Sequence, residues 1–509
     1  MDTNNIMYKL FTAFEQNDIK YLHFKSNTNL SDSFCGKGDF DVLVDKAEIV
    51  KVEELILAHN GKRHNTMAVG NYVGVDNWLV FDELSGIIYH LHLHYQLVTG
   101  KQFVKDYVIP WNNLLFATRI KDSEFGLFIT KPSVELILLA FRIVLKAKFF
   151  DYLKKLTGTY RLSKAMQKEW DDLSGKSSEC EIRDNLKMIC HDNNVEKVTN
   201  ILCKTSLSTR DYLFLHRFVV KVMKPYKRYS TLMALIKTFK AQSEYKIERF
   251  WNKRMNGDAI TKKISLQGGL IIAFVGVDGS GKSTVSNDIF RWIAKKIECK
   301  RYYMGTGDGK TTMLVSIING IFNLTRNKKK TVEKAGKKTH DIDQKHRISF
   351  FSNPKSFINK NLKVCMISSV QKNNYSKIRK MHKYRLNGGI SILDRWPQIE
   401  YAQQNDGPKL SYYSDILSNR KAIQRKVEKE KRYLGIVNTI KPDIIFRLNI
   451  SLDTCMNRKS EHTDKELFEN KIHELSKLTF QGAPIVEVDA EQPYHEELLF
   501  IKKTLWKYI

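Results

Sequence analysis

The pattern of apolar and polar positions divides the chain into regions that differ in the secondary structure they predict. Residues 1–130 hold short apolar runs separated by turn signals, and three of these runs, Asp41–Val44, Trp78–Phe81 and Ile87–Leu97, have the length and composition of strands. Short strands mixed with helical segments are typical of an α+β domain. We therefore expect an α+β domain over residues 1–130.

The next stretch, residues 131–255, is predicted to be nearly all helix. Pro132 follows a polar start and suits the first turn of a helix. Apolar residues then recur at helical spacing through Leu136, Leu139 and Ile143. This pattern indicates a helical extension of the first domain.

Residues 256–268 are polar and contain glycine, so we expect a linker there. From Leu270 onward, apolar strand-like runs alternate with helical segments, which predicts an α/β domain over residues 269–509 with a doubly wound parallel sheet. The run Leu270–Val275 is continuously apolar, as in a strand buried on both faces.

The cysteines and the length of the longest apolar run limit the class of protein. The seven cysteines have no C-x-x-C spacing and their number is odd, which argues against a disulfide framework or a zinc site. The start of the chain lacks the charged and apolar regions of a signal peptide. The longest apolar stretch, Val134–Leu145, contains Arg142 and is shorter than the roughly 20 residues of a spanning helix. These features predict a cytoplasmic protein without a membrane span.

The chain is strongly basic, with 84 Lys and Arg against 55 Asp and Glu and a net charge of +29. One interpretation is a nucleic-acid or anionic-membrane partner. The other is a lysine-rich surface with sites for phosphorylated ligands. The densest basic run is Arg326–Lys338, and no zinc-finger or aromatic–basic RNA-binding pattern accompanies it. We favour the second interpretation and leave a nucleic-acid partner open.

The apolar run ending at Val275 leads directly into a complete G-x-x-x-x-G-K-[ST] motif, the P-loop. Glycines let backbone N–H groups converge on phosphate oxygens, and the following helix adds positive potential at its start. Lys282 is expected to reach the β- and γ-phosphates of ATP, and the Ser283 hydroxyl to ligate Mg²⁺. The predicted nucleotide-binding residues are Gly276, Gly279, Ser280, Gly281, Lys282, Ser283 and Thr284.

Two later strands end in polar residues. Ile390–Asp394 is apolar until Asp394, whose carboxylate at the end of a parallel strand would lie beside the P-loop and hold Mg²⁺. Arg395 would bind an acceptor phosphate or the transferred phosphoryl group. The strand at 442–450 is followed by a helical start with Arg458, which is either part of a lid over the phosphates or a solvated helix face.

Together, FVGVDGSGKST, ILDRW, PDIIFRLNIS and VEVDA resemble the thymidylate kinase-like family of nucleoside and nucleotide kinases over about residues 268–509. The resemblance implies that Asp278 contacts the acceptor's sugar hydroxyl or orients the acceptor. It also implies that Arg395 binds the acceptor phosphate and that Arg458 belongs to the lid. Asp489 and Ala490 would lie near the adenine.

The chain also departs from that family. Trp396-Pro397 follows the Asp-Arg pair where the family usually has Tyr, and a long basic insertion covers about residues 310–385. The insertion and the run Tyr303–Gly309 resemble divergent thymidylate kinase-like proteins found with surface-polysaccharide genes. Kinase chemistry carries over from the resemblance, but thymidylate as the acceptor does not follow.

In the first domain, Asp39 and Asp41 lie two residues apart at a glycine-rich strand start and project to the same side. Paired carboxylates of this kind hold a divalent metal for attack on a nucleoside triphosphate. With Ser26 upstream, the pattern resembles the nucleotidyltransferase fold.

That fold usually supplies a third carboxylate, and here His92 takes its expected place, with Asp82 as a substitute elsewhere. His90, His92 and His94 alternate on one strand face and either bind metal or simply line it, the interpretation we favour. The domain is therefore either a transferase with an altered site or a substrate-binding domain.

The sequence as a whole predicts ATP- and Mg²⁺-dependent phosphoryl transfer to a small acceptor, which is a nucleotide, a nucleoside or a phosphosugar. One alternative is an ATP-dependent regulator or nucleic-acid-binding protein without such turnover. Another is that only the N-terminal half is catalytic. The sequence leaves a monomer and a homodimer both open.

Overall fold

The computed structural model divides the chain into two compact units, Met1–Leu266 and Gln267–Ile509, which are considered separately below. The residues that the structure describes are 4–66, 70–147, 162–255, 262–304, 354–401, 406–410, 421–458 and 465–509.

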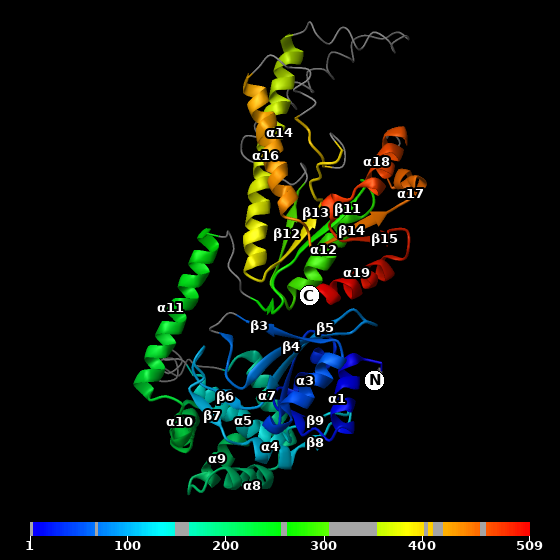
Figure 1. The fold of residues 1–509 in the computed structure, drawn as a ribbon. Helices are drawn as coiled ribbons and strands as arrows, with labels where there is room; N and C mark the ends of the chain where they lie inside the picture. The colour runs from blue at the N-terminus through cyan, green and yellow to red at the C-terminus, as the bar shows by residue number, and fades with distance from the viewer. Residues whose placement is uncertain are drawn as a thin grey trace, which may run out of the picture. The chain divides into compact units, whose positions relative to one another are not determined.

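Within the described residues, the first unit contains an eight-stranded mixed sheet in the order β10-β3-β4-β5-β2-β1-β9-β8, and a two-stranded sheet of β6 and β7 (Figure 1). Two strand pairs of the large sheet are parallel, β2 with β5 and β1 with β9. The strands are β1 Tyr21–His23, β2 Asp39–Val44, β3 Gly61–Asn65, β4 Val75–Phe81, β5 Ile88–His94, β6 Leu97–Thr99, β7 Tyr107–Ile109, β8 Ile120–Lys121, β9 Phe128–Ile129 and β10 Ile264–Ser265.

The pairing of β2 with β5 determines which polar side chains meet in this unit. In its register Asp39 lies opposite His90 and Asp41 lies opposite His92. Apolar residues between them, such as Phe40 and Leu91, are buried in a core that also receives side chains of α1 and α3. Because side chains alternate between the two faces of a strand, the aspartates and histidines share the opposite face.

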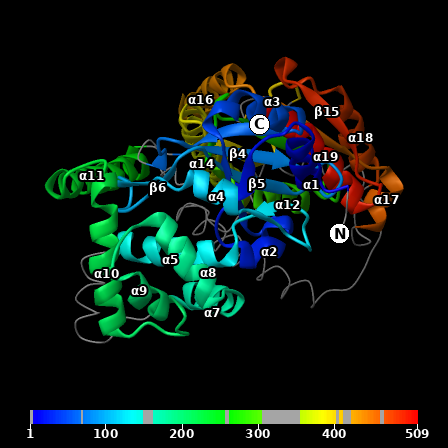
Figure 2. The ribbon, with the colours of Figure 1, turned by 90° about the horizontal axis from the view of Figure 1, so that it is seen from below.

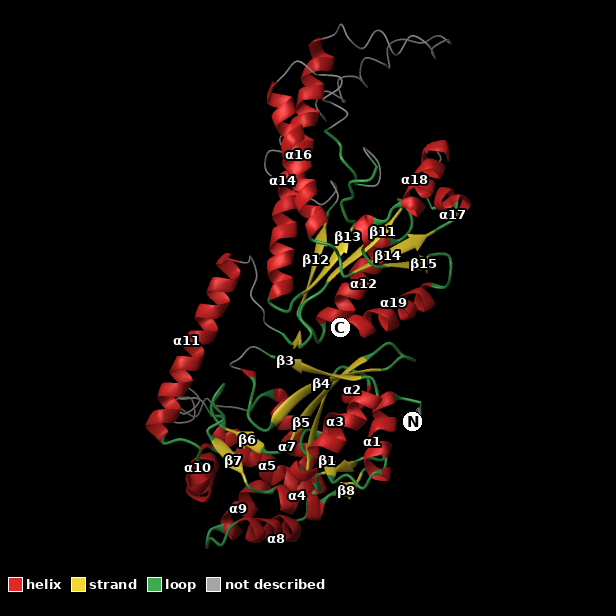
Figure 3. Ribbon diagram, viewed as in Figure 1, coloured by secondary structure: helices red, strands yellow, loops and turns green. Residues whose placement is uncertain are grey.

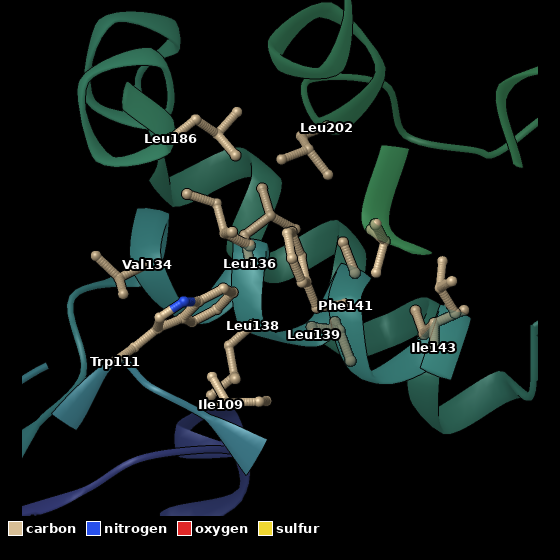
Figure 4. Packing of buried hydrophobic residues seen from close by; sticks show 14 of the residues in the cluster. Ile109, Trp111, Val134, Leu136, Leu138, Leu139, Phe141, Ile143, Leu186 and Leu202 are labelled. Carbon is tan, nitrogen blue, oxygen red and sulfur yellow. The ribbon is translucent and has the colours of Figure 1, made fainter. Parts of the chain in front are cut away.

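Four helices of the first unit gather around α5, which is buried along most of its length. Figure 2 shows α7, α8, α9 and α10 near α5, and each contacts it. Leucine, phenylalanine and tryptophan side chains, among them Trp111 and Phe141, fill the space between these helices (Figure 4). The helices are α1 Ile6–Gln16, α2 Leu30–Phe34, α3 Ile49–Ala58, α4 Asn112–Thr118, α5 Pro132–Leu145, α7 Lys164–Lys176, α8 Glu179–Ile189, α9 Val195–Leu202, α10 Thr209–Met223 and α11 Thr231–Met255.

The second unit has, in its described part, a five-stranded parallel sheet in the order β12-β13-β11-β14-β15, which confirms an α/β fold. The strand at the sheet edge, β12, was not predicted, because its residues are polar and aromatic rather than aliphatic. The strands are β11 Ile271–Gly276, β12 Cys299–Tyr303, β13 Ile390–Asp394, β14 Ile444–Asn449 and β15 Ile485–Asp489.

Helices cover this sheet (Figure 3). Ile271, Ala273 and Val275 pack into one core with residues of α14, α16 and α18. The alternate residue Phe274 points to the other face, where its ring stacks on Phe446 with centroids 5.3 Å apart. The helices are α12 Lys282–Ala294, α14 Pro354–Leu386, α16 Lys421–Thr439, α17 Leu452–Asn457, α18 Lys465–Lys477 and α19 Tyr494–Tyr508.

The predicted basic insertion is only partly visible in this arrangement. Its later part belongs to α14, which packs along α16. The run Arg326–Lys338 and residues 305–309 lie outside the described residues. Across the described ranges, no helix has both the length and the apolar character needed to cross a bilayer.

Candidate functional site

The glycine-rich loop joins the central strand β11 to α12 and depends on glycine at specific positions. Gly279 and Gly281 have φ angles of 97° and 87°, the left-handed region that side-chain-bearing residues rarely adopt. A Cβ at Gly276 would collide with Ser280 Oγ and lie 3.0 Å from the carbonyl oxygen of Leu448. The loop therefore keeps its backbone exposed to a ligand only with glycine at these positions.

Lys282, the first residue of α12, is buried and turned back onto the loop. Its Nζ donates a hydrogen bond to the carbonyl oxygen of Val277 at 2.6 Å. Burial, followed by the positive charge of Arg395, lowers the pKa of Lys282 to about 8. An anionic ligand would be a stronger partner for this buried ammonium than the Val277 carbonyl oxygen.

Ser283 and Asp394 meet at the carboxyl edge of the sheet, as the sequence predicted for residues at the ends of parallel strands. Ser283 Oγ donates to Asp394 Oδ2 at 2.5 Å. The other carboxylate oxygen, Asp394 Oδ1, is buried and has no hydrogen-bond partner among the described residues. The Asp394 carboxylate thus lies beside the first turn of α12 and keeps one buried oxygen without a hydrogen bond to the described residues.

Arg301 on β12 is a member of this cluster that sequence reasoning missed. Its guanidinium donates to Asp394 Oδ2 at 3.2 Å, to Ser286 Oγ at 3.2 Å and to the carbonyl oxygen of Ser283 at 3.3 Å. It thus ties β12, α12 and β13 together. The only signal for it was an arginine within a weak strand pattern.

Arg395 follows Asp394 directly and takes a left-handed backbone conformation with a φ angle of 77°. Its guanidinium lies between two carboxylates, 2.7 Å from Asp278 Oδ1 and 3.5 Å from Asp406 Oδ2. Its Nε is buried and forms no hydrogen bond with the part of the chain that is described. Asp278 and Arg395, which the sequence placed in one site, are therefore in direct contact.

Arg458 lies at the C-terminal end of α17 and bridges the loop to the last strand. It donates to the carbonyl oxygens of Gly279 at 3.3 Å and of Ala490 at 3.4 Å. The carboxylate of Asp489 accepts the backbone N–H of Glu491 at 2.9 Å. Arg458 thus connects the glycine-rich loop to Ala490, whereas the Asp489 carboxylate is engaged in the turn that follows β15.

Two cavities adjoin at Arg395. The first, which we call the loop cavity, has a volume of about 170 Å³ and is lined by Gly276, Lys282 and Lys471 among others. The second has a volume of about 280 Å³ and lies against α14 and α16. The lining residues that both cavities share are Asp278, Arg395, Asp406 and Lys409.

The second cavity, which we call the aromatic cavity, has flat apolar walls with a few polar groups. Tyr375 of α14 and Tyr433 of α16 stack there with ring centroids 4.5 Å apart. Asn374 donates to the carbonyl oxygen of Met304 at 2.7 Å, while its own Oδ1 is buried and has no partner within the described ranges. Such a cavity suits a small ligand with a ring and hydrogen-bonding groups.

The polar groups at the loop also fit Mg²⁺. Ser283 Oγ and the unpartnered Asp394 Oδ1 are oxygen donors, the type that Mg²⁺ prefers. The donor set is small, as expected for an ion that takes its remaining ligands from water and substrate phosphates.

In the first unit, Asp39 and Asp41 lie on β2 as predicted, but they have different partners. Asp39 Oδ1 is 2.9 Å from His90 Nδ1. Asp41 Oδ1 is 2.8 Å from Lys25 Nζ, so a cation of the protein already lies where a shared metal would bind Asp41. Asp82 accepts the Ser85 hydroxyl within a tight turn.

A further cavity of about 310 Å³ in the first unit, the cationic cavity, is lined by Lys25, Lys105, Arg142, Lys146 and Lys263, and no carboxylate is among its described lining residues. Arg142 Nη1 is buried without a hydrogen-bond partner in the described part of the chain. Desolvation, followed by the like charges of Arg142, Lys25 and Lys105, lowers the pKa of Lys146 to about 7. Crowded cations of this kind favour an anionic ligand.

The fold and the loop define an α/β protein that carries a complete G-x-x-x-x-G-K-[ST] motif between its central strand and the following helix. No protein-family model matches the chain. It is similar to the uncharacterized ATP-binding protein YghR of Escherichia coli strain K12, at 26% identity over 232 residues, which are 45% of this chain and 83% of that protein. It is also similar to the uncharacterized ATP-binding protein YghS of the same strain, at 28% identity over 45% of this chain and 89% of that protein.

Proposed function

We propose that the second unit binds ATP with Mg²⁺ and transfers the terminal phosphoryl group to a small acceptor, in the manner of a thymidylate kinase-like P-loop kinase. The observation that carries the proposal is the meeting of the loop cavity and the aromatic cavity at Arg395. One cavity offers a phosphate cradle and the other offers a place for an acceptor. The Arg395 guanidinium lies where the two cavities adjoin.

The donor side rests on the loop between β11 and α12. Its left-handed glycines and the start of α12 suit a triphosphate, and Lys282 would exchange the Val277 carbonyl for phosphate oxygens. Both relatives described above carry "ATP-binding" in their names. We infer that ATP is the phosphoryl donor.

Ser283 and Asp394 would hold Mg²⁺, Asp394 directly or through water. Mg²⁺ bound there would neutralise charge on the phosphates as the phosphoryl group is transferred. Arg301 keeps the Asp394 carboxylate oriented toward the start of α12. Lys282, Arg395 and Arg458 supply positive charge around the transferred group.

The acceptor side rests on the aromatic cavity. Tyr375 and Tyr433 offer apolar ring surface, which suits a nucleobase or a sugar. Arg395, held by Asp278 and Asp406, presents its guanidinium at the mouth of the cavity, where an acceptor phosphate would bind. We infer a nucleotide, a nucleoside or a phosphosugar as the acceptor.

The test is a screen for acceptor-dependent ADP release with Mg-ATP over nucleotides, nucleosides and phosphosugars. Turnover with one acceptor class, lost in Lys282→Ala, supports the kinase. An ATP-dependent regulator would instead bind ATP without acceptor-dependent turnover. A salt-titrated DNA and RNA binding assay checks that alternative, because nucleic-acid binding would be tight and steeply salt-dependent.

For the first unit we propose binding of a phosphate-bearing ligand in the cationic cavity. The support is the group of five bases and the unpartnered Arg142 Nη1. Inorganic pyrophosphate binding would be measured on the Lys282→Ala chain, so that the loop of the second unit does not contribute. Adding Arg142→Gln should weaken binding about tenfold or more, whereas Lys221→Gln, at a side chain 71% exposed, should not.

Nucleotidyl transfer by the first unit is tested separately. Metal-dependent pyrophosphate release from a nucleoside triphosphate, lost in Asp39→Asn, would show that the unit is a transferase. Ligand binding without such release would identify it as a substrate-binding unit.

A further inference from the structure

The strand pair β2–β5 gathers aspartates and histidines into a compact group. Ligand atoms of Asp39, His90 and His92 lie within 4.8 Å of one another, and so do those of Asp41, His92 and His94. The His90 and His92 rings are adjacent, with centroids 4.0 Å apart. The hydrogen bonds of each imidazole decide which of its nitrogens can bind a metal.

His90 presents a nitrogen lone pair to Asp39. Its Nε2 lies 3.1 Å from Asn77 Oδ1, an amide oxygen that only accepts hydrogen bonds, so Nε2 carries the proton. The other ring nitrogen of His90, Nδ1, faces the Asp39 carboxylate. That Nδ1 is buried, forms no hydrogen bond with any described residue and lies 2.9 Å from Asp39 Oδ1.

When Nε2 carries the only proton of the His90 ring, Nδ1 and Asp39 Oδ1 are both hydrogen-bond acceptors. The two atoms repel at that distance unless a proton or a metal cation lies near both of them. The His90 side chain is only 1% exposed, whereas the Asp39 side chain is 40% exposed, so ions approach this contact from the side of Asp39.

His92 is arranged in the same way. Its Nδ1 lies 3.2 Å from Asp41 Oδ1, a carboxylate oxygen that accepts hydrogen bonds and also lies 2.8 Å from Lys25 Nζ. Nδ1–H therefore donates to Asp41, which leaves Nε2 with a lone pair. A histidine that donates its second ring N–H to a carboxylate or an amide oxygen is the usual arrangement of a metal ligand.

We propose that Asp39, His90 and His92 bind a divalent transition metal, with Asn77 and Asp41 orienting the two imidazoles. Two nitrogens and one carboxylate favour Zn²⁺, Co²⁺ or Fe²⁺ over Mg²⁺. The group of Asp41, His92 and His94 is the weaker candidate, because Lys25 already neutralises Asp41. Asp41 then acts as a support for His92 and not as the metal ligand that the sequence predicted.

The site is open on one side. The side chains of Asp39 and His92 are 40% and 30% exposed, whereas His90 is buried. Three protein ligands with solvent access leave positions for water or substrate, as in catalytic metal sites and unlike closed structural ones. The proposal is independent of the kinase site, since none of its ligands belongs to the second unit.

The test uses the untagged full-length chain, stripped with a chelator and titrated with Co²⁺ alone by absorption spectroscopy and with Zn²⁺ alone by calorimetry. We expect one equivalent of tight binding that excess Mg²⁺ does not displace. Asp39→Asn and His92→Gln should each weaken binding at least about tenfold, and Asn77→Ala about tenfold through His90. His191→Gln, at an exposed histidine outside the cluster, should change nothing.

Circular dichroism of each variant separates loss of the metal from loss of the fold. Asp39 is partly exposed and Asp39→Asn preserves its shape, so this variant should fold normally. The proposal is overturned if the wild-type chain binds no Co²⁺ at millimolar concentration. It is also overturned if folded Asp39→Asn and His92→Gln bind the metal as tightly as the wild type.

Discussion

Ser283 Oγ lies 2.5 Å from Asp394 Oδ2, although the two residues are 111 positions apart in the chain. Ser283 lies in the first turn of the helix after the glycine-rich loop, and Asp394 ends the neighbouring parallel strand. The contact brings together the two oxygen groups that we propose as Mg²⁺ ligands. Removing the charge of Asp394 therefore tests the proposed Mg²⁺ site directly.

Asp394→Asn keeps the shape of the side chain but removes its charge. Because Mg²⁺ would lose an anionic ligand, phosphoryl transfer should fall on the order of 100-fold and need more Mg²⁺. ADP release measured across a Mg²⁺ titration checks this. Asp453→Asn, at an exposed residue in the first turn of α17, is the control and should behave as wild type.

Lys282→Ala removes the ammonium that we place on the phosphates. Phosphoryl transfer should fall by about 100-fold or more, because the phosphates would lose a buried positive charge held against the loop. The fold should persist, since the hydrogen bond that Lys282 Nζ gives up is a single one to the Val277 carbonyl oxygen of a loop. Lys295→Ala at the exposed end of α12 is the matched control, and unchanged ADP release in Lys282→Ala would refute the assignment.

ATP affinity should depend on pH through Lys282. Burial, then the charge of Arg395, lowers its pKa to about 8 in the free protein, below the ordinary value of 10.5. Bound phosphates favour the charged form, so ATP binding requires proton uptake above pH 8 and affinity should fall by up to about tenfold per pH unit there. Below pH 8 the lysine is already charged and the dependence should level off.

Calorimetry at several pH values between 7 and 9.5 measures this effect. The Lys282→Ala chain should bind ATP weakly and lack the decline above pH 8. A wild-type affinity that stays constant over this range would contradict the role given to Lys282.

Arg395→Lys keeps the positive charge but loses the planar fork that lies between Asp278 and Asp406. We expect the acceptor KM to rise about 10- to 100-fold, because a bidentate contact to the acceptor phosphate would be lost. The KM for ATP should change less. Arg425→Lys on the exposed face of α16 is the control, and equal changes in both KM values would argue against a role on the acceptor side.

Much of the second unit could be predicted from local pattern. The aliphatic runs at 270–275 and 390–394 correspond closely to β11 and β13, because a strand buried on both faces needs uninterrupted apolar residues. The glycine-rich loop and Lys282 were equally accessible, since the motif is contiguous and its backbone conformation depends on glycine. In the first unit, the same local reasoning identified Asp39 and Asp41 on β2.

The sequence did not show which residues from distant segments contact one another. Arg301 reaches Asp394 only because the edge strand β12 pairs with β13, and the stack of Tyr375 on Tyr433 depends on how α14 packs along α16.

Nδ1 of His90 faces Asp39 because of the β2–β5 register, and Lys25 reaches Asp41 from another segment. Strand order, register and helix packing are set by the burial of the whole core, which no local pattern encodes. The sequence by itself thus determined the most apolar strands, the glycine-rich loop and the chemical groups, whereas only the tertiary structure decided which of those groups share a site.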